Sequence, residues 1–391
     1  MTEDDDSTRI DRRKFLKKVG VRVGVGVATV GGMGAIAYGT KKLLDNTLLD
    51  PNYKFPYSGD ESRPMGLADV EAEYARVYDQ LAEAKSKAEA ENKQLRVVMG
   101  ELHDLPRSFI HSLIVSDVAV RLGIADCVVE QPKESFQSLS ENCKSIRNSR
   151  YSIFDSHSFT NLELRPHAER FKKIKASPHK DLLPYMHSVL NLGMEAEARL
   201  AREPNNDDYA PSQACTFSLT GGRVHCGDPE RVGPNGEKRA RHDPIVENAM
   251  VDAVAGVPGH CISKFGVSHL PFIVDKLRNR EDTLLVAYDV TNSHKVSTGV
   301  AGRPSKRWPE KLQALKDEGL VQDLRLDGRE PSYGQVVEMV MKASLDHRCK
   351  PHRGRPAELD AETAAFVQSI WPALVKDARE DVKANLQGVG R

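Results

Sequence analysis

Hydrophobic residues recur along this chain with two different spacings, which predict alternating helices and strands. From residue 67 to 92 they recur at steps of three and four and the other face carries Glu, Lys and Arg, which predicts an amphipathic helix. The next hydrophobic run, 95–99, is short, rich in β-branched residues and ends at Gly100, which predicts a strand. A helix between Pro106 and Gly123 and a strand at 125–129 are predicted next. One strand-helix-strand unit of this kind favours a parallel sheet.

The same alternation returns after a polar, loop-rich middle region that spans residues 140–240. Two helices are predicted within that region, at 163–175 and 181–202. After it, strands are predicted at 261–265 and 283–288, and helices at 244–256, 270–280, 332–345 and 360–378. The fold class is therefore predicted to be α/β, with a parallel-type sheet core and a helical C-terminal extension. The basic stretches of that extension, 303–311 and 348–355, are interpreted as solvated loops in preference to an anion or lipid-headgroup site.

Composition shifts divide the chain into four predicted segments. Residues 1–40 form a targeting segment and 41–66 a polar linker interrupted by proline. The α/β core is predicted over 67–292, and the helical extension over 293–391.

The first of these segments resembles a twin-arginine export signal. The run Arg12-Arg13-Lys14-Phe15-Leu16-Lys17 precedes an uncharged stretch, 23–40, that is rich in Gly and Val. Glycines dilute this stretch below the roughly 20 strongly apolar residues of a stable membrane anchor, which favours cleavage at Ala35-Ile36-Ala37. Lys41 and Lys42 keep an uncleaved anchor open as the alternative. We expect export to the periplasm or the extracellular space by the twin-arginine translocation machinery, with membrane contact only through an uncleaved N-terminal segment.

Charge and composition argue against a nucleic-acid-binding protein and against a disordered one. The 391 residues include 56 basic and 56 acidic side chains, and this balance argues against a nucleic-acid partner, because nucleic-acid binders usually carry a net basic surface. The chain is 39% hydrophobic and has no long polar repeat, so it is expected to fold rather than remain disordered. A small-molecule or peptide substrate is the partner expected of such a protein.

The six cysteines are compatible with an oxidising compartment without requiring one. Cys215 and Cys226 flank a hairpin-like run that turns at Gly221-Gly222, so they are the most plausible disulfide pair. A zinc site made by these two cysteines and His225 lacks a fourth ligand at a suitable spacing. Free thiols are the remaining alternative.

Two segments of the form Gly-x-x-His stand at the carboxyl ends of predicted strands. They are Gly100–His103 and Gly266–His269, and a predicted helix follows each one. Ligands of open parallel sheets bind beyond these strand ends, where a glycine permits a sharp turn and a close approach of the backbone. The strand at 125–129 leads into Glu130, which places a carboxylate on the same edge. The candidate site therefore consists of Glu101, His103, Glu130 and His269.

Two imidazoles and two carboxylates support two kinds of chemistry. A histidine oriented by a carboxylate can act as general base, because the unperturbed imidazole pKa of about 6.5 lies near working pH. Alternatively, His103, Glu130 and His269 can hold a divalent metal such as Mn, Co or Zn that acidifies a bound water. A histidine at a strand end is also compatible with a purely structural role.

The same residues carry a resemblance to a known superfamily over residues 95–292. The stretch Val97-Val98-Met99-Gly100-Glu101-Leu102-His103-Asp104, with His111 downstream, resembles the opening of the erythromycin esterase and ChaN-like group. The stretch Phe265-Gly266-Val267-Ser268-His269-Leu270-Pro271 is similar to the closing motif of the TraB/TIKI relatives. This resemblance implies an α/β core of two pseudo-related halves. It also implies an arginine at the start of the helix before the last motif, and Arg241, displaced by one residue, is the candidate for anchoring an anion or oxyanion.

Members of this superfamily include a hydrolase of macrolide lactones, metal-dependent peptidases and haem-iron binders, and three functions remain open here. The first is an exported hydrolase of an ester or amide carbonyl. Its predicted catalytic residues are Glu101, His103, Glu130, Arg241 and His269. The second is a haem- or metal-binding protein without turnover, although no tyrosine stands next to the motifs to bind haem iron. The third is a non-enzymatic surface protein whose helical tail makes the contacts.

Overall fold

The parallel sheet predicted from the hydrophobic pattern is the centre of the fold in the computed structural model. The structure describes residues 63–101, 106–133, 136–137, 140–141, 164, 167–175, 177–202, 222–240, 242–291, 308–324, 326, 328 and 331–388. Within these residues six strands form one sheet in the order β3-β2-β4-β1-β5-β6, and every neighbouring pair is parallel. The strands are β1 (Gln94–Glu101), β2 (Asp126–Pro132), β3 (Arg223–Asp228), β4 (Cys261–Gly266), β5 (Thr283–Asp289) and β6 (Val321–Asp323).

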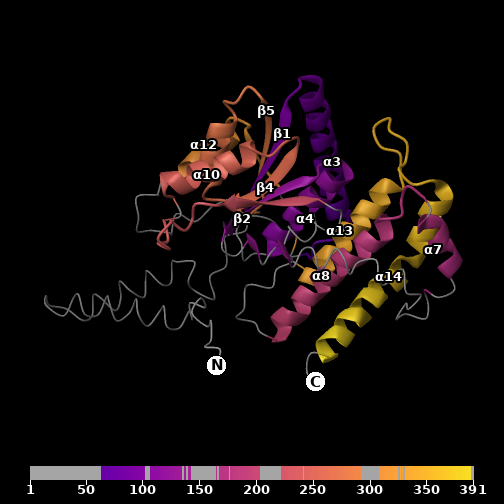
Figure 1. Ribbon diagram of the computed structural model, residues 1–391. Coiled ribbons are helices and arrows are strands. Elements are labelled where there is room, and N and C mark those ends of the chain that lie inside the picture. The colour runs from indigo at the N-terminus through magenta and orange to yellow at the C-terminus, as the bar shows by residue number, and fades with distance from the viewer. Residues whose placement is uncertain are drawn as a thin grey trace, which may run out of the picture. The chain divides into compact units, whose positions relative to one another are not determined.

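Helices cover both faces of this sheet (Figure 1). They are α3 (Leu67–Ala90), α4 (Pro106–Arg121), α7 (Ala168–Lys175), α8 (Leu182–Arg202), α10 (Pro244–Ala255), α11 (Leu270–Leu277), α12 (Trp308–Asp317), α13 (Tyr333–Arg348) and α14 (Ala361–Gly388). All the described residues belong to one compact unit of the chain. This confirms the α/β class and the predicted strands and helices. Most of their ends agree within a few residues, but α14 continues ten residues beyond its predicted end at 378 and α7 begins five residues after its predicted start at 163.

Alternate residues of β1 pack in two separate hydrophobic cores, as the two-residue period of a strand requires. Val97 and Met99 of β1 pack in the larger core with residues of α3, α4, α8, α13 and α14. Val98, between them, packs in a second core with residues of α10, α11 and α12. The sheet is therefore buried on both faces, which explains why its central strands are rich in hydrophobic residues.

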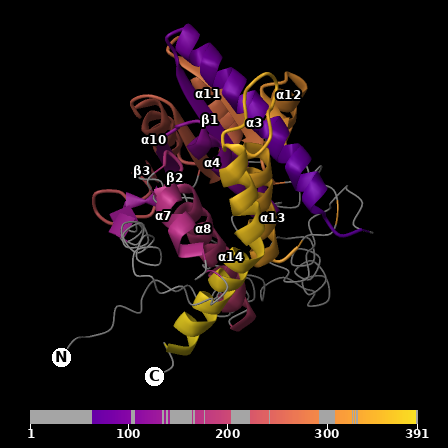
Figure 2. The same cartoon turned by 90° about the vertical axis from the view of Figure 1, so that its right-hand side faces the viewer.

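The C-terminal segment contributes to the sheet as well as to the helical layer. Its short strand β6 pairs with β5, and α12, which precedes β6, packs in the smaller core. Residues Val336, Val337, Val340 and Met341 of α13 are buried in the larger core. Figure 2 shows α13 and α14 running together on the side of the molecule that carries α3 and α8. The sequence pattern predicted α13 and α14 but neither α12 nor β6.

The segment expected to form a hairpin includes β3, which pairs with β2 in parallel register. The turn at Gly221 and the first half of that run, with Cys215, lie outside the described residues, so the disulfide remains a prediction. The export signal at residues 1–40 also lies outside them. Among the described residues no helix is long and apolar enough to cross a membrane.

Candidate functional site

Acidic side chains mark the carboxyl edge of the sheet at five of its six strands. These residues are Glu101 of β1, Glu130 of β2, Asp228 of β3, Asp289 of β5 and Asp323 of β6. Two lysines neutralise three of them. The Lys264 ammonium lies 2.6 Å from Oε2 of Glu101, and the Lys316 ammonium lies 2.6 Å from both Asp289 and Asp323. Glu130 is different, because an imidazole faces it.

That imidazole belongs to His269, which follows β4 at the turn into α11. Nε2 of His269 lies 3.7 Å from Oε1 of Glu130, and its Nδ1 lies 3.4 Å from Oε1 of Glu247. The residue is only 1% exposed, and neither ring nitrogen has a hydrogen-bond partner among the described residues. A buried polar group of this kind is costly and calls for an explanation.

The backbone around His269 is fixed by the turn that the Gly-x-x-His motif predicts. The carbonyl of Glu101 accepts a hydrogen bond from Val267 N (2.8 Å), which ties the end of β1 to the turn. A Cβ atom at Gly100 would lie 2.7 Å from Cδ2 of Leu270 and 3.2 Å from Cα of Val267. A side chain at position 100 would therefore crowd this turn, and glycine allows the close approach of β1 to it.

Glu130 is held in place by the same turn. Its Oε2 accepts a hydrogen bond from the backbone N–H of Gly266 at 2.5 Å, and its side chain is only 9% exposed. Its other oxygen, Oε1, is left on the side of His269. The end of β2 and the turn after β4 therefore hold a carboxylate and an imidazole in one fixed arrangement.

Two further residues reach His269 from the start of α10. Asp243 caps this helix by accepting a hydrogen bond from Ile245 N (2.8 Å), and proline follows at the first helical position. His242 precedes the cap, and Glu247 lies in the first turn of the helix. Nδ1 of His242 lies 2.8 Å from Oε1 of Glu247, and the rings of His242 and His269 have centroids 4.7 Å apart.

The two histidines control the charge of Glu247. Burial alone would raise its pKa, but the hydrogen bond with His242 (2.8 Å) and the nearby rings of His242 and His269 lower the pKa to about 2. Glu247 is therefore a carboxylate at any physiological pH. We call His242, Glu247, His269 and Glu130 the His269 cluster.

The structure brings together only part of the predicted site. Glu130 and His269 face each other as predicted, whereas Glu101 forms its ion pair with Lys264. His103 and Arg241 lie outside the described residues, so their placement remains a prediction. His242 and Glu247 were not predicted as site residues. The local signal that points to them is the Asp243-Pro244 helix start, which places a histidine before the cap and a glutamate in the first turn.

Two groups of side chains among the described residues have donor atoms close enough to share one metal ion. The first is His242, Glu247 and His269, whose donor atoms lie within 4.8 Å of one another. The second is His187 of α8 with Asp377 and Asp381 of α14. In this second group Nε2 of His187 already forms a 3.0 Å hydrogen bond with Asp377. The first group suits a borderline divalent metal, because imidazole and carboxylate are the ligands such ions accept.

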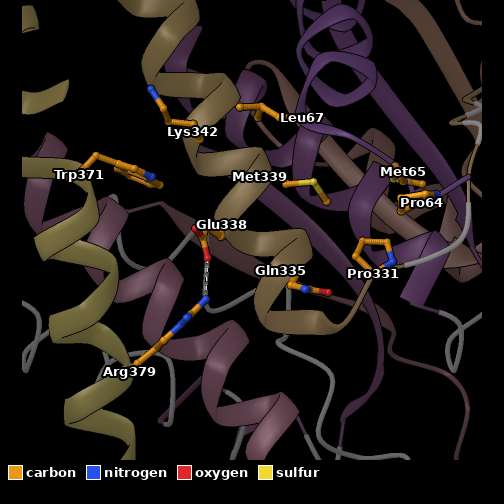
Figure 3. A pocket seen from close by; sticks show the side chains of 10 residues that line it. All are labelled: Pro64, Met65, Leu67, Pro331, Gln335, Glu338, Met339, Lys342, Trp371 and Arg379. Atoms are coloured by element: carbon orange, nitrogen blue, oxygen red, sulfur yellow. Dashed lines mark hydrogen bonds and ion pairs between the residues drawn. The ribbon is translucent and has the colours of Figure 1, made fainter. Parts of the chain in front are cut away.

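A separate cavity of about 580 Å³ lies between the start of α3, α13 and α14 (Figure 3). Hydrophobic side chains such as Met65, Met339 and Trp371 line it, and the ion pair between Glu338 and Arg379 (2.8 Å) stands at its side. No residue of the His269 cluster lines this cavity. It is therefore a feature of the helical layer and not part of the site at the sheet edge.

No family model matches this chain, and no match was found among curated proteins or solved structures. The resemblance to the erythromycin esterase, ChaN-like and TraB/TIKI group therefore remains a prediction from the two short motifs.

Proposed function

We propose that this chain is an exported hydrolase that attacks an ester or amide carbonyl with a water molecule activated at the His269 cluster. One observation carries the proposal. His269 is buried at the carboxyl edge of a parallel sheet, lies between two carboxylates, and has no hydrogen-bond partner for either ring nitrogen among the described residues. Ligands of such sheets bind beyond this edge, and titratable groups that shift one another's pKa values are concentrated at active sites.

The chemistry would follow from the position of the ring between Glu130 and Glu247. A carboxylate on one nitrogen fixes the orientation of an imidazole and stabilises its protonated form, so that the ring can take a proton from water. A divalent metal held by the same residues would instead lower the pKa of a bound water. Both routes deliver a hydroxide equivalent to the carbonyl carbon of a small-molecule or peptide substrate, and the bond to the alcohol or amine then breaks.

The proposal includes the finer architecture that the motifs imply, a core of two pseudo-related halves of the erythromycin esterase and ChaN-like kind. It is supported by the pairing of β1 with β4, since the two Gly-x-x-His motifs begin at the ends of these neighbouring parallel strands. In such a core Glu101 and His103 would join the His269 cluster from β1, and Arg241 would bind the developing oxyanion.

Hydrolysis of p-nitrophenyl esters and of unstructured peptides tests the proposal. The purified protein is assayed without metal and with Mn²⁺, Co²⁺ or Zn²⁺, beside the variants His269→Gln and Glu130→Gln. His225→Gln is the matched control, because His225 is a partly exposed histidine that bonds to Asp126 near the start of β2. We expect turnover that both cluster variants reduce by at least about 100-fold and the control retains. Equal activity in all four proteins, or none under any condition, contradicts the proposal.

Export is a separate part of the proposal, supported by the Arg12-Arg13 motif and the weakly hydrophobic stretch that follows it. Replacing both arginines by lysine should leave the protein in the cytoplasmic fraction. Sequencing the N-terminus of the exported protein then distinguishes cleavage after Ala37 from an uncleaved anchor. Export that is indifferent to the two arginines would contradict this route.

A metal- or haem-binding protein without turnover is the second candidate. The donor atoms of His242, Glu247 and His269, which lie within 4.8 Å of one another, favour the metal form of this candidate. A metal content of one per chain, or a Soret absorption band, in a protein that hydrolyses nothing would support it.

A further inference from the structure

We infer that His242, Glu247 and His269 are the three protein ligands of one divalent transition-metal ion, and that Glu130 orients His269 as a ligand. The inference deepens the proposed function and rests on it for the role of the metal in hydrolysis. It replaces the ligand set expected from the motifs, His103, Glu130 and His269, by one in which two members come from the start of α10.

The chemical type of the three side chains is the first support. Two imidazoles and one carboxylate are a ligand set of catalytic zinc sites, in which three protein ligands leave one position open for water or substrate. Glu247 supplies a carboxylate oxygen, and His242 and His269 each supply a ring nitrogen. The set thus combines one oxygen ligand with two nitrogen ligands.

The distances are the second support. Ligands that lie about 2.0–2.1 Å from a tetrahedral ion are about 3.3–3.4 Å from each other. Nδ1 of His269 and Oε1 of Glu247 are 3.4 Å apart, which matches this spacing. Nδ1 of His242 is closer to the same oxygen, at 2.8 Å, because a hydrogen bond joins the two atoms. His242 is 32% exposed, so its side chain has room to exchange that hydrogen bond for a metal bond.

The third support is His269 itself. Neither ring nitrogen has a hydrogen-bond partner among the described residues, although the side chain is 99% buried. A metal on Nδ1 would satisfy one nitrogen. Glu130, whose Oε1 is 3.7 Å from Nε2, would accept the proton of the other. Histidine ligands commonly donate their second ring N–H to a carboxylate in this way, which fixes the tautomer and the orientation of the ring. Glu130 is a positioning residue in this arrangement, and Gly266 N holds it there.

The cluster of His187, Asp377 and Asp381 is the competing metal site among the described residues, and it serves as an internal comparison. His187 and Asp377 are both almost fully buried and form a direct 3.0 Å hydrogen bond between two long helices. Asp381 is 3.8 Å from the same nitrogen and 16% exposed. Both ring nitrogens of His187 have hydrogen-bond partners, Asp377 and Asn191, whereas neither ring nitrogen of His269 has one among the described residues, so we assign the metal to the His269 cluster.

Binding of Zn²⁺ and Co²⁺ to the metal-stripped full chain tests the inference. Calorimetry gives the stoichiometry with Zn²⁺, and the visible absorption of bound Co²⁺ reports the ligand set independently of activity. We expect one ion per chain. His242→Gln and His269→Gln should each weaken binding by at least 100-fold, and Glu130→Gln should weaken it by about 10–100-fold. His225→Gln and Asp381→Asn should bind as the wild type does. Circular dichroism of each metal-free variant verifies that it folds, and His242→Gln, at a partly exposed position, is the variant that should retain the fold most readily.

Several results would overturn the inference. They are the absence of binding, binding that His242→Gln and His269→Gln leave unchanged, and binding that Asp381→Asn abolishes. The failure of the proposed function is distinguishable from these results. A protein that binds one ion at the His269 cluster but hydrolyses no ester or peptide supports the metal site and overturns the proposed hydrolase. A protein that hydrolyses substrate but binds no ion supports the proposed hydrolase and overturns the metal site.

Discussion

Nδ1 of His269, at the turn after β4, lies 3.4 Å from Oε1 of Glu247, in the first turn of α10. The contact joins a strand-to-helix turn at the sheet edge to the start of a helix that packs on one face of the sheet. His242 and Glu130 complete the arrangement from two other directions. One buried imidazole therefore lies next to two carboxylates and a second imidazole.

Glu130→Gln should remove the charge of the Glu130 side chain and keep its hydrogen bond with Gly266 N. Glutamine keeps an oxygen that can accept from Gly266 N, so the free energy of unfolding should change by less than about 1 kcal/mol. Hydrolysis should fall by about 100-fold or more, because the ring of His269 loses the charge that orients it. Parallel urea unfolding and ester-hydrolysis assays measure both effects. Unchanged activity in a folded Glu130→Gln protein would remove Glu130 from the site.

Gly100→Ala should disturb the site through the backbone. The added methyl group would lie 2.7 Å from Leu270 Cδ2 and 3.2 Å from Val267 Cα, so the turn that carries His269 must move. We expect a loss of about 1–3 kcal/mol in the free energy of unfolding, as in other overpacked cores. The loss of Zn²⁺ affinity or hydrolysis should exceed what this destabilisation explains at temperatures where the variant is folded. A variant with wild-type stability and affinity would contradict the close approach of β1 to this turn.

A buried polar network in the helical layer should be sensitive to Asp117→Ala. The Asp117 carboxylate accepts hydrogen bonds from the hydroxyls of Tyr74 (2.5 Å) and Tyr185 (2.9 Å), and all three side chains are buried. Its removal leaves two tyrosine hydroxyls without this acceptor, so we expect the free energy of unfolding to fall by about 3 kcal/mol. Asp275→Ala, at a side chain that is 58% exposed, is the control and should change it by less than about 1 kcal/mol. Equal urea midpoints for the two variants would contradict the role of the network.

His347 should make the stability of this layer depend on pH. Burial, together with the positive charge of Arg121 and of His352, lowers its pKa to about 4 in the folded protein. The unfolded chain, with an imidazole pKa of about 6.5, therefore binds the proton more readily between pH 6.5 and 4. The contribution of His347 to the free energy of unfolding is therefore fully present above about pH 6.5, and it is lost as the pH falls toward 4.

Thermal or urea unfolding of His347→Gln measures this contribution. Glutamine can still accept the hydrogen bond that Arg121 gives to Nδ1 of His347 (3.2 Å), but it does not titrate. Between pH 7 and pH 5 the wild type should lose about 1–2 kcal/mol more stability than the variant. Parallel pH profiles for the two proteins would show that His347 is not held in the neutral form.

The sequence predicted the parts of the fold that repeat a local pattern. Strands β1, β2, β4 and β5 are recognisable because burial on both faces gives them short runs rich in hydrophobic residues. β6 has only three residues, and β3 begins with the exposed, charged Arg223, so neither has such a run. The strand order β3-β2-β4-β1-β5-β6 depends on how the crossover helices pack on the sheet, and no local pattern contains that information.

The candidate site was predictable to the same extent. The Gly-x-x-His turn and the carboxylate at the end of β2 are local features, and the structure places Glu130 beside His269. Glu101 lies at the predicted edge, but it pairs with Lys264 of the neighbouring strand β4. This pairing depends on the register between β1 and β4, which the motif does not predict. His242 and Glu247 reach the site because α10 packs beside α11, so their role appears only in three dimensions.

Anomalous diffraction from crystals grown with Zn²⁺ is the most direct test of the central claim that these four side chains form one chemical site. We predict one strong peak within about 2.0–2.1 Å of a nitrogen of His242, a nitrogen of His269 and an oxygen of Glu247, with Glu130 hydrogen-bonded to the other nitrogen of His269. A map in which the ion binds elsewhere, or in which the rings of His242 and His269 point to different surfaces of the protein, would contradict it.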